Sequence, residues 1–373
     1  MSDVFPPNPT LKDVAQQAGC SAAVASKVLN GSRGNVMVGK ATAERVRAIA
    51  DRLGYRANFA ARSLVARSTR TLGLYIWPGQ PFANMSGSYE SAILRGVDAV
   101  TQQAGYDMLL LNTAGPDPLE HCLAKCREGR FDGLLVVRSP ADPQWFSQLV
   151  RCMPRVVAFD TTAEAPGLDV AMFDHRAAAR AAVEYLAEKG HRRIGFIGNT
   201  RVPPDELAVG DFAGYERRTG FLDAVQALGL PHRREWIFDY RWQREAVDAQ
   251  ATDYLQAEGA QAVRWMESLD EPPTALVAGV YRSAFGAVPQ WQQMGLAVPG
   301  DRSLIGLGDR DWCAYFSPSL TNVANPLTEM GQWAASRLID RCEQRADDAE
   351  SMRKFFSPQV VERQSAGPVP ESQ

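Results

Sequence analysis

The chain has 373 residues, of which 45% are hydrophobic, and a formal net charge of −3. This length is too great for one ordinary domain, and the composition can supply more than one hydrophobic core. No run of about eighteen apolar residues occurs, and the amino terminus lacks the charged-then-apolar pattern of a secretory signal. We therefore expect a cytoplasmic protein without a membrane segment, whose six scattered cysteines are reduced thiols rather than a disulfide framework.

Charge is distributed unevenly along the chain. Residues 1–70 hold eleven lysines and arginines against four acidic residues, a net charge of +7, whereas the remainder carries −10. A basic head on an acidic body indicates that contacts with nucleic-acid phosphates are confined to the head. The alternative, a disordered basic arm, is disfavoured because apolar residues recur in the head at helical spacing.

Residues 10–30, TLKDVAQQAGCSAAVASKVLN, predict two short helices joined by one tight turn. Thr10 and Asp13 have the spacing of a capping box, Gly19 suits the turn, and Ser21 can cap the second helix. Two helices in this order are typical of a DNA-binding helix-turn-helix, whose second helix enters the major groove.

Val24 and Val28 are expected to face inward from the second helix. A third amphipathic segment, residues 42–53, would close a three-helix core, and GYRANFAARSL follows from residue 54. This order of elements resembles the LacI/GalR family of bacterial transcription regulators. The resemblance is carried by TLKDVAQQAG, by S-x-x-x-x-S-K-V-L-N-G from residue 21, and by G-Y-R-x-N-x-x-A-R-S-L.

The resemblance implies which residues contact DNA. Ala22, Ala23 and Lys27 match positions that read bases; alanine can touch a thymine methyl group, so polar readout would fall to Lys27 on guanine. Phosphate contacts would come from serine and asparagine side chains. The complete set of expected DNA contacts is Thr10, Ser21, Ala22, Ala23, Ser26, Lys27, Asn30, Asn58 and Leu64.

Residues 58–64 resemble the family's hinge helix, which orders when two subunits sit on an operator. Leu64 matches the leucine that wedges into the minor groove, and such a wedge unstacks a base step and bends the duplex. The alternative is that Leu64 only packs within a linker.

Apolar strand-like runs alternate with helix-length segments from residue 71 onward. The runs start with TLGLYIW and continue at residues 106–111, 133–137, 155–159, 193–197, 236–238, 274–278 and 303–306, with helical segments such as 91–104 and 177–189. This alternation predicts an α/β fold of parallel sheets flanked by helices. The number of strands favours two doubly wound lobes, whose strand ends converge on one ligand cleft.

Two further segments extend the family resemblance, EKGHRRIGFIG from residue 188 and PSLTNVANPLTEMGQWAASRLI from residue 318. They imply a type I periplasmic-binding-protein-like effector core behind the all-α head, with chain crossings near Phe173 and Leu320. The last strand would span residues 355–361. Because the tail lacks the leucine heptads with which some relatives tetramerise, a homodimer is expected.

These expectations divide the chain as follows. The helix-turn-helix domain takes residues 1–56, the hinge helix and linker 57–70, the effector-binding and dimerisation core 71–363, and a mobile tail 364–373. Within the core, lobe 1 would hold residues 71–173 and 320–345, and lobe 2 residues 174–319 and 346–363.

By position, Asp160, Asp174 and Arg217 match polar ligand contacts of sugar-binding relatives. Carboxylates and a forked guanidinium suit vicinal hydroxyls or a small anion, although each could instead cap a helix or form a structural ion pair. Aromatic residues near the cleft could stack on a sugar face or only fill space. The full set of expected effector contacts is Phe82, Asp160, Phe173, Asp174, Arg217, Tyr281 and Trp312.

Two departures from the family pattern leave the effector's class open. The Asn-Asp pair usual after the strand at 274–278 is replaced by Val280 and Tyr281, and the usual Asp after the next strand is Gly308. Both missing groups bind sugar hydroxyls in many relatives. A modified sugar, a short oligosaccharide or no sugar at all are all compatible with this pattern.

The sequence thus predicts a DNA-binding repressor of a palindromic operator, controlled by a small, sugar-like effector and acting without cofactor or metal. The alternatives are a cytoplasmic small-molecule-binding protein and an α/β enzyme with a DNA-binding head. The GxxG at residues 195–198 is not a full dinucleotide fingerprint, and no catalytic triad or second ligand pair beside His121, Cys122 and Cys126 is evident. Catalysis is therefore not expected.

Overall fold

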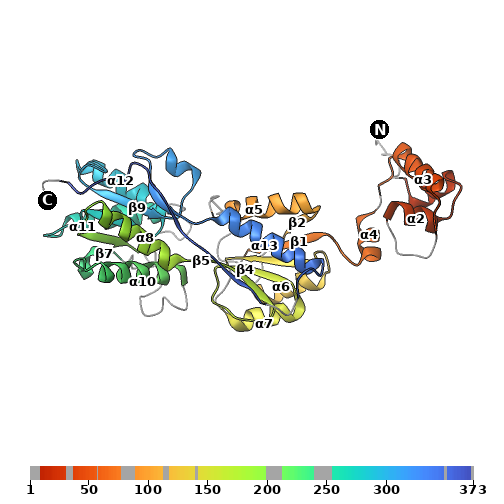
Figure 1. Cartoon of the computed structure of the whole chain (residues 1–373), viewed down its shortest axis with the longest axis horizontal. Helices are drawn as coiled ribbons and strands as arrows, with labels where there is room; N and C mark the ends of the chain where they lie inside the picture. The colour runs from red at the N-terminus through yellow and green to blue at the C-terminus, as the bar shows by residue number, and fades with distance from the viewer. Residues whose placement is uncertain are drawn as a thin grey trace.

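The computed structural model describes residues 9–30, 37–56, 58–76, 89–111, 117–138, 142–198, 212–238, 254–347 and 351–370. A small helical head, a linker helix and two α/β lobes follow one another along the longest axis of the molecule (Figure 1). The predicted fold class, an all-α head with a two-lobed α/β core, is confirmed.

The head is built from α1 (Leu11–Gln17), α2 (Ala22–Asn30) and α3 (Lys40–Leu53). The capping box predicted at α1 is present: the Thr10 side chain accepts from the Asp13 amide at 3.3 Å, and the Thr10 amide donates to the Asp13 carboxylate at 2.8 Å. Gly19 ends the turn in the left-handed region, with φ of 59°. The buried core residues are Val14, Ala15, Ala18, Ala25, Val46 and Ala50.

The prediction that Val24 and Val28 provide the inward face of α2 is partly wrong. The fully buried residue of this helix is Ala25, whereas Val24 and Val28 are only half-buried. A methyl group at position 25 lets α2 approach α1 and α3, both of which it contacts, more closely than a larger side chain would.

A short helix, α4 (Phe59–Ala66), connects the head to lobe 1, close to the predicted hinge segment. The chain beyond it is fastened by Asp132, which lies directly before the third strand. One carboxylate oxygen accepts from the Ser68 hydroxyl at 2.6 Å and the Arg70 amide at 2.8 Å, and the other from the Thr69 amide at 2.7 Å. The linker is therefore rigidly attached to lobe 1 at residues 68–70.

Each lobe contains a six-stranded sheet. The lobe 1 sheet is parallel in the order β11-β5-β4-β3-β1-β2, with β1 (Thr71–Ile76), β2 (Asp107–Leu110), β3 (Gly133–Val137), β4 (Val156–Phe159), β5 (Leu168–Phe173) and β11 (Arg353–Phe356). The lobe 2 sheet has the order β12-β10-β9-β8-β6-β7, with β6 (Ile194–Ile197), β7 (Ile237–Phe238), β8 (Ala275–Ala278), β9 (Ser303–Leu307), β10 (Thr321–Ala324) and β12 (Gln359–Val361). Among the strands of the described residues, β12 alone is antiparallel to its neighbour.

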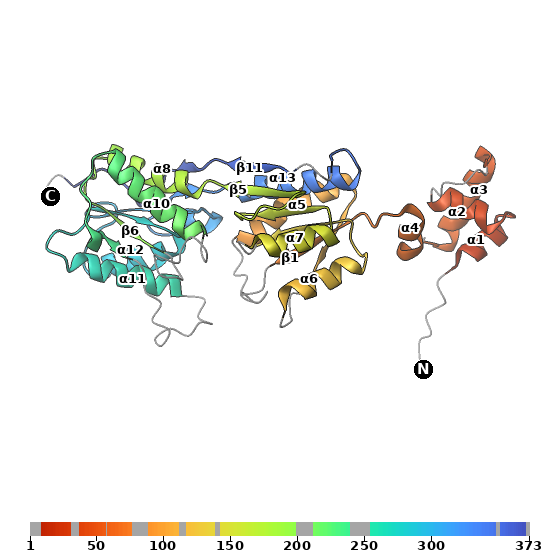
Figure 2. The ribbon, with the colours of Figure 1, turned by 90° about the horizontal axis from the view of Figure 1, so that it is seen from below.

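Helices cover both faces of each sheet (Figure 2). In lobe 1, α5 (Tyr89–Ala104) and α13 (Leu327–Cys342) cover one face, while α6 (Pro118–Arg127) and α7 (Pro143–Cys152) cover the other. In lobe 2, α8 (His175–Glu188) and α10 (Phe212–Ala227) lie opposite α11 (Tyr254–Glu267) and α12 (Ala284–Gln293). The short 3-10 helices are η2 (Arg234–Trp236), η3 (Tyr281–Ser283) and η4 (Asp311–Ala314).

Helices α5 and α13 pack unusually closely at two glycines. A Cβ atom on Gly96 would lie 2.0 Å from the Thr328 carbonyl oxygen, and one on Gly331 would lie 2.2 Å from that of Ile93. These positions admit no side chain, so the two glycines set the distance between the helices.

The strand pairings correct the predicted division of the core. Residues 321–324, assigned to lobe 1, form β10 in the lobe 2 sheet, and residues 353–356, assigned to lobe 2, form β11 in the lobe 1 sheet. The single strand predicted at 355–361 is two strands in different lobes, because Pro358 lacks the amide hydrogen that a continuous ladder requires. The chain therefore crosses between the lobes after β5, β10 and β11.

The tail predicted to be mobile is held against lobe 2 as far as residue 369. The Leu304 amide donates to the Ser365 carbonyl oxygen at 2.8 Å, and the Val369 amide donates to that of Lys189 at 3.0 Å. Ser365 is fully buried. Backbone hydrogen bonds, which the polar composition of this segment does not reveal, immobilise it.

Candidate functional site

The first turns of α2 carry most of the residues predicted to contact DNA. Ala22 and Ala23 are exposed, Lys27 is half-buried, and Ser21 lies just before the helix, where its hydroxyl accepts from the Val24 amide at 3.3 Å. Ser21 is therefore a helix cap whatever else it contacts. The structure brings these side chains to the one face where a recognition helix would present them.

The other predicted DNA contacts lie at the edges of this face. Thr10 is exposed and caps α1, Ser26 is half-buried on α2, and the Asn58 carbonyl accepts from the Arg62 amide at the start of α4. Leu64 and Asn30 belong to α4 and α2, but their side chains lie outside the described residues. Contact of this set with DNA stays a prediction.

Asp160 lies on the lobe 1 wall of the predicted cleft, directly after β4, in the left-handed region with φ of 45°. Its carboxylate accepts from the Tyr89 hydroxyl and from the Phe173 amide, both at 2.8 Å, and lies 3.7 Å from Nε2 of His175. Burial alone would raise the pKa of Asp160, but the interactions with His175, Phe173 and Tyr89 hold it below its ordinary 3.8. Asp160 thus fastens β4, β5 and α5 together.

Arg217 of α10 reaches the same region from lobe 2. Its Nε donates to Nδ1 of His175 at 3.3 Å and its Nη1 to the Gly279 carbonyl oxygen at 3.1 Å. His175, which is buried at the start of α8, lies between Asp160 of lobe 1 and Arg217 of lobe 2. Sequence reasoning missed His175, although a histidine directly after the first crossing strand was available as a signal.

Asp174 is the N-cap of α8, where its side chain accepts from the Ala177 amide at 2.8 Å. This is the capping alternative noted for it above. Phe173 is buried, with its ring edge-on to His175 at a centroid distance of 5.0 Å. Phe82 lies outside the described residues.

The two departures from the family pattern, at Val280–Tyr281 and at Gly308, belong to one packing arrangement on the lobe 2 side of the cleft. Tyr281, which is buried, lies against the strand ends so closely that a Cβ atom on Gly306 would come within 3.0 Å of its Cβ, and one on Gly308 within 3.2 Å of its ring. Gly308 also has φ of 90°, a conformation that other residues rarely adopt. The tyrosine ring therefore occupies the space next to position 308.

Arg310 is a cleft residue that sequence reasoning did not single out. Its guanidinium lies over the Tyr281 ring, with 5.9 Å between its central carbon and the ring centroid. Burial lowers its pKa, and Tyr89 of lobe 1 is among the side chains that act on it electrostatically. An available signal was its place three residues beyond a buried strand, at the edge where parallel sheets bind ligands.

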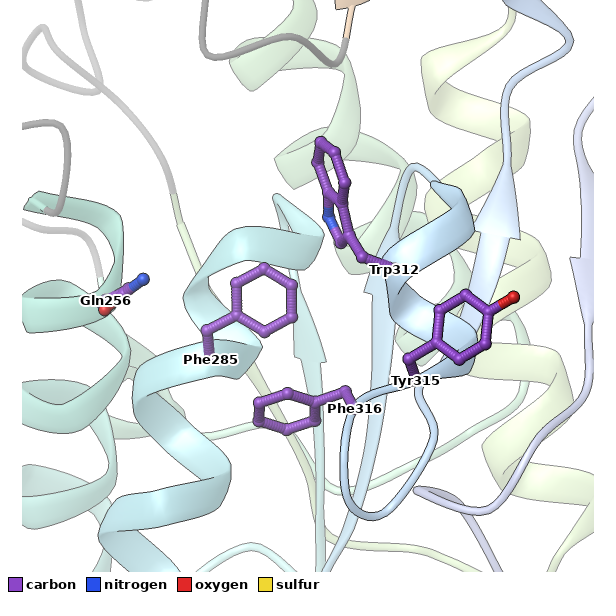
Figure 3. Close-up of a pocket in the computed structure, with 5 residues that line it drawn as sticks. All are labelled: Gln256, Phe285, Trp312, Tyr315 and Phe316. Atoms are coloured by element: carbon purple, nitrogen blue, oxygen red, sulfur yellow. The ribbon is translucent and has the colours of Figure 1, made fainter.

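Trp312 lines an open aromatic pocket of about 510 Å³ in lobe 2, next to Arg310 in sequence. Figure 3 shows Trp312, Phe285 and Phe316 turned toward one space, with Gln256 opposite and the Tyr315 hydroxyl directed away. Trp312 and Tyr315 are strongly exposed for aromatic residues. Such a surface suits the flat, apolar face of a ring.

Among the described residues, no group of three or more His, Cys, Asp or Glu side chains is placed to hold a metal ion. Cys122 and Cys126 are buried on α6 as free thiols. In the part of the chain that the structure describes, no helix has both the length and the apolar composition needed to cross a bilayer.

The comparisons with known proteins match both parts of the chain. Residues 10–58 match the family described as bacterial regulatory proteins, lacI family, and residues 183–366 match the periplasmic binding protein-like domain. Among the curated relatives are the HTH-type transcriptional repressors PurR of Aliivibrio salmonicida, 30% identical over 95% of this chain and 98% of the relative, and of Photorhabdus laumondii, 31% identical over 95% and 96%.

Solved structures support the same fold. A lac repressor dimer bound to operator and the anti-inducer ONPF has a TM-score of 0.74 at 21% identity, over 96% of this chain and 99% of that one. A transcriptional regulator CelR–cellobiose complex has a TM-score of 0.64 at 23% identity, with the same coverage. With its helix-turn-helix head, hinge segment and two-lobed core, the chain belongs to the lacI family of bacterial regulatory proteins, and it is a DNA-binding transcriptional regulator.

Proposed function

We propose that the protein is a homodimeric repressor that binds a palindromic operator and changes its operator affinity when a small molecule binds between its lobes. The observation that supports this proposal is a continuous connection: the helix-turn-helix head leads through α4 to a linker that Asp132 fastens to lobe 1, at the sheet edge opposite the one that holds Asp160. A change in the cleft can therefore reach the head through the strands of the lobe 1 sheet.

The relatives support this proposal. Those named PurR are transcriptional repressors, and the lac repressor structure is titled a dimer bound to operator. The structures titled with cellobiose and with ribose support a sugar or sugar derivative as the effector. Because repressors of this kind are not enzymes and act on chromosomal DNA, the proposal includes no catalytic activity and a cytoplasmic location.

The test is selection of bound duplexes from a randomised DNA pool with the full-length protein at near-physiological salt. The expected result is a palindromic site with a flexible central step, of the size that two recognition helices span. Retention of DNA without sequence preference, which disappears as the salt concentration rises, would contradict a specific operator.

A further inference from the structure

Arg310 stands out because its charge has no carboxylate partner among the described residues. Nη1 donates to the Asp309 carbonyl oxygen and, at 3.3 Å, to Oδ1 of Asn325, so both acceptors are neutral. Nε is buried and makes no hydrogen bond within the part of the chain that is described. A half-buried guanidinium whose buried Nε is an unused donor is costly unless an anion completes its charge.

The neighbouring carboxylate is committed elsewhere. Asp309 accepts two parallel hydrogen bonds of 2.8 Å from Arg363, and a third of 3.0 Å from Nδ2 of Asn322. Burial alone would raise the pKa of Asp309, but these bonds hold it below its ordinary value, so the carboxylate is ionised and fully used by Arg363. The side chains of Asp309, Arg363 and Arg310 together carry a net charge of +1.

The acidic groups on the facing wall are committed as well. Glu90, which is buried, pairs with Arg138, and Asp160 is held by Tyr89 and the Phe173 amide. The core as a whole is acidic, with a net charge of −10 beyond residue 70. Among the described residues, the positive charge of Arg310 thus has no carboxylate partner although the core as a whole is acidic.

The surface beneath Arg310 is aromatic. Its guanidinium lies over Tyr281, whose ring is edge-on to Phe285 at 5.9 Å, and Phe285 packs against Phe316 at 5.0 Å. Phe285 and Phe316 also line the pocket together with Trp312 (Figure 3). A ligand whose oxyanion met Arg310 could lay its uncharged part along these rings.

We propose that the effector carries an oxyanion, a carboxylate or phosphoryl group, and that the fork of Arg310 binds it. A guanidinium matches both groups with two parallel hydrogen bonds. This inference rests on the proposed function, and it narrows the expected effector to a sugar acid or a sugar phosphate rather than a neutral sugar. The ionic contact selects against neutral analogues because they would leave the half-buried charge of Arg310 unmatched.

The test uses the full-length protein and simple anions, so it does not require the effector's skeleton. Thermal midpoints are measured at constant ionic strength in chloride, acetate and inorganic phosphate, for the wild type, Arg310→Gln, Arg310→Lys and Arg180→Gln. Arg180 is exposed on α8, and its loss removes the same charge outside the cleft. Phosphate or acetate should raise the thermal midpoint of the wild type and of Arg180→Gln relative to chloride. The rise should be smaller in Arg310→Lys and smallest in Arg310→Gln. The anion that gives the larger rise distinguishes a phosphoryl ligand from a carboxylate ligand.

Equal stabilisation of the wild type and Arg310→Gln would overturn the proposal, and so would equal losses in Arg310→Gln and Arg180→Gln. Matched D-glucose, D-glucuronate and D-glucose 6-phosphate then extend the series to ligands, with operator affinity measured in the same samples. Operator binding that responds only to neutral sugars would refute the anionic effector and leave the repressor function standing. Absence of any specific operator would instead refute the proposed function.

Discussion

Asp160 shows how one side chain can shape a ligand cleft without itself being shown to bind a ligand. It joins three elements through Tyr89, the Phe173 amide and His175, in a left-handed conformation that Asn also tolerates. Asp160→Asn therefore removes the charge while keeping the shape. It separates a positioning role from direct contact with the effector.

We expect Asp160→Asn to lower the free energy of unfolding by about 1–3 kcal/mol, because the amide nitrogen would face one of the two present donors. The pKa of Asp160 is depressed below 3.8, so its ionised form stabilises the fold above that pH and the stabilisation is lost as the pH falls further. The difference between the two proteins in urea titrations should accordingly shrink below pH 3.8. An unchanged unfolding midpoint at neutral pH together with lost effector binding would show direct contact instead.

The residue types at the site could be predicted better than their roles. Asp160 and Arg217, which the sequence predicts to share one cleft, both lie against His175, whereas their contact with an effector stays a prediction. Whether a carboxylate caps a helix, as Asp174 does, depends on the backbone around it, which no single sequence specifies. Sequence reasoning missed Arg310 because the neighbouring Asp309 pairs instead with Arg363, which lies 54 residues further along the chain.

Helix α13 follows the second crossing and returns the chain to lobe 1. Asp169 of β5, which is fully buried, accepts from Arg337 at 2.8 Å and Arg341 at 3.1 Å, and also from the Met352 amide at 2.7 Å. The carboxylate therefore ties α13, β5 and the chain entering β11 into one unit.

Asp169→Asn should destabilise the protein by about 3–5 kcal/mol, because it leaves two arginines beside an amide in a site without water. Asp340→Asn is the matched control on the same helix, since Asp340 pairs with Arg345 at the surface and should cost less than about 1 kcal/mol. Urea unfolding at neutral pH measures both. Similar losses in the two variants would show that burial does not decide the strength of these pairs.

The hinge element supplies a prediction for DNA binding. If α4 presents Leu64 to the minor groove, Leu64→Ala should weaken operator binding at least tenfold, since the wedge that stabilises the bent duplex is lost. Binding of non-specific duplex and of effector should be unchanged. Equal operator affinity of both proteins in a mobility-shift titration would assign Leu64 to the linker only.

The positions of the strands could be predicted from the sequence better than the lobe to which each strand belongs. The hydrophobic runs at β1, β3 and β8 follow from local patterning, and all three strands lie near the expected residues. The pairings of β10 and of β11, which lie in different sheets, are non-local. β10 begins with buried Thr321 and Asn322: the Thr321 hydroxyl accepts from the Arg363 amide, and Nδ2 of Asn322 donates to Asp309. Such partners become apparent only when the sheets are assembled.

At the scale of the whole molecule, lobe 1 lies between the cleft and the head, and the proposed function requires the two sites to communicate through it. Arg95 of α5 lies 3.9 Å from Asp311 of η4, so the two lobes also meet in an exposed ion pair at the cleft. Such a pair is weak and easily broken, which leaves the relative position of the lobes to the ligand. The linker held by Asp132 transmits that position toward α4.

Thermodynamic linkage gives a quantitative test of the coupling between effector binding and operator binding. If saturating effector changes operator affinity by a given factor, operator DNA must change effector affinity by the same factor. Asp132→Ala removes the acceptor of Ser68, Thr69 and Arg70, so it should reduce that factor severalfold while effector affinity of the DNA-free protein stays the same. Asp107→Ala, an exposed change on the neighbouring β2, should leave the factor unaltered.

Fluorescence anisotropy with labelled operator and calorimetry with effector provide the two sides of the cycle. An undiminished factor in Asp132→Ala would mean that the cleft controls the head through another route, such as the arrangement of the two subunits, rather than through this attachment.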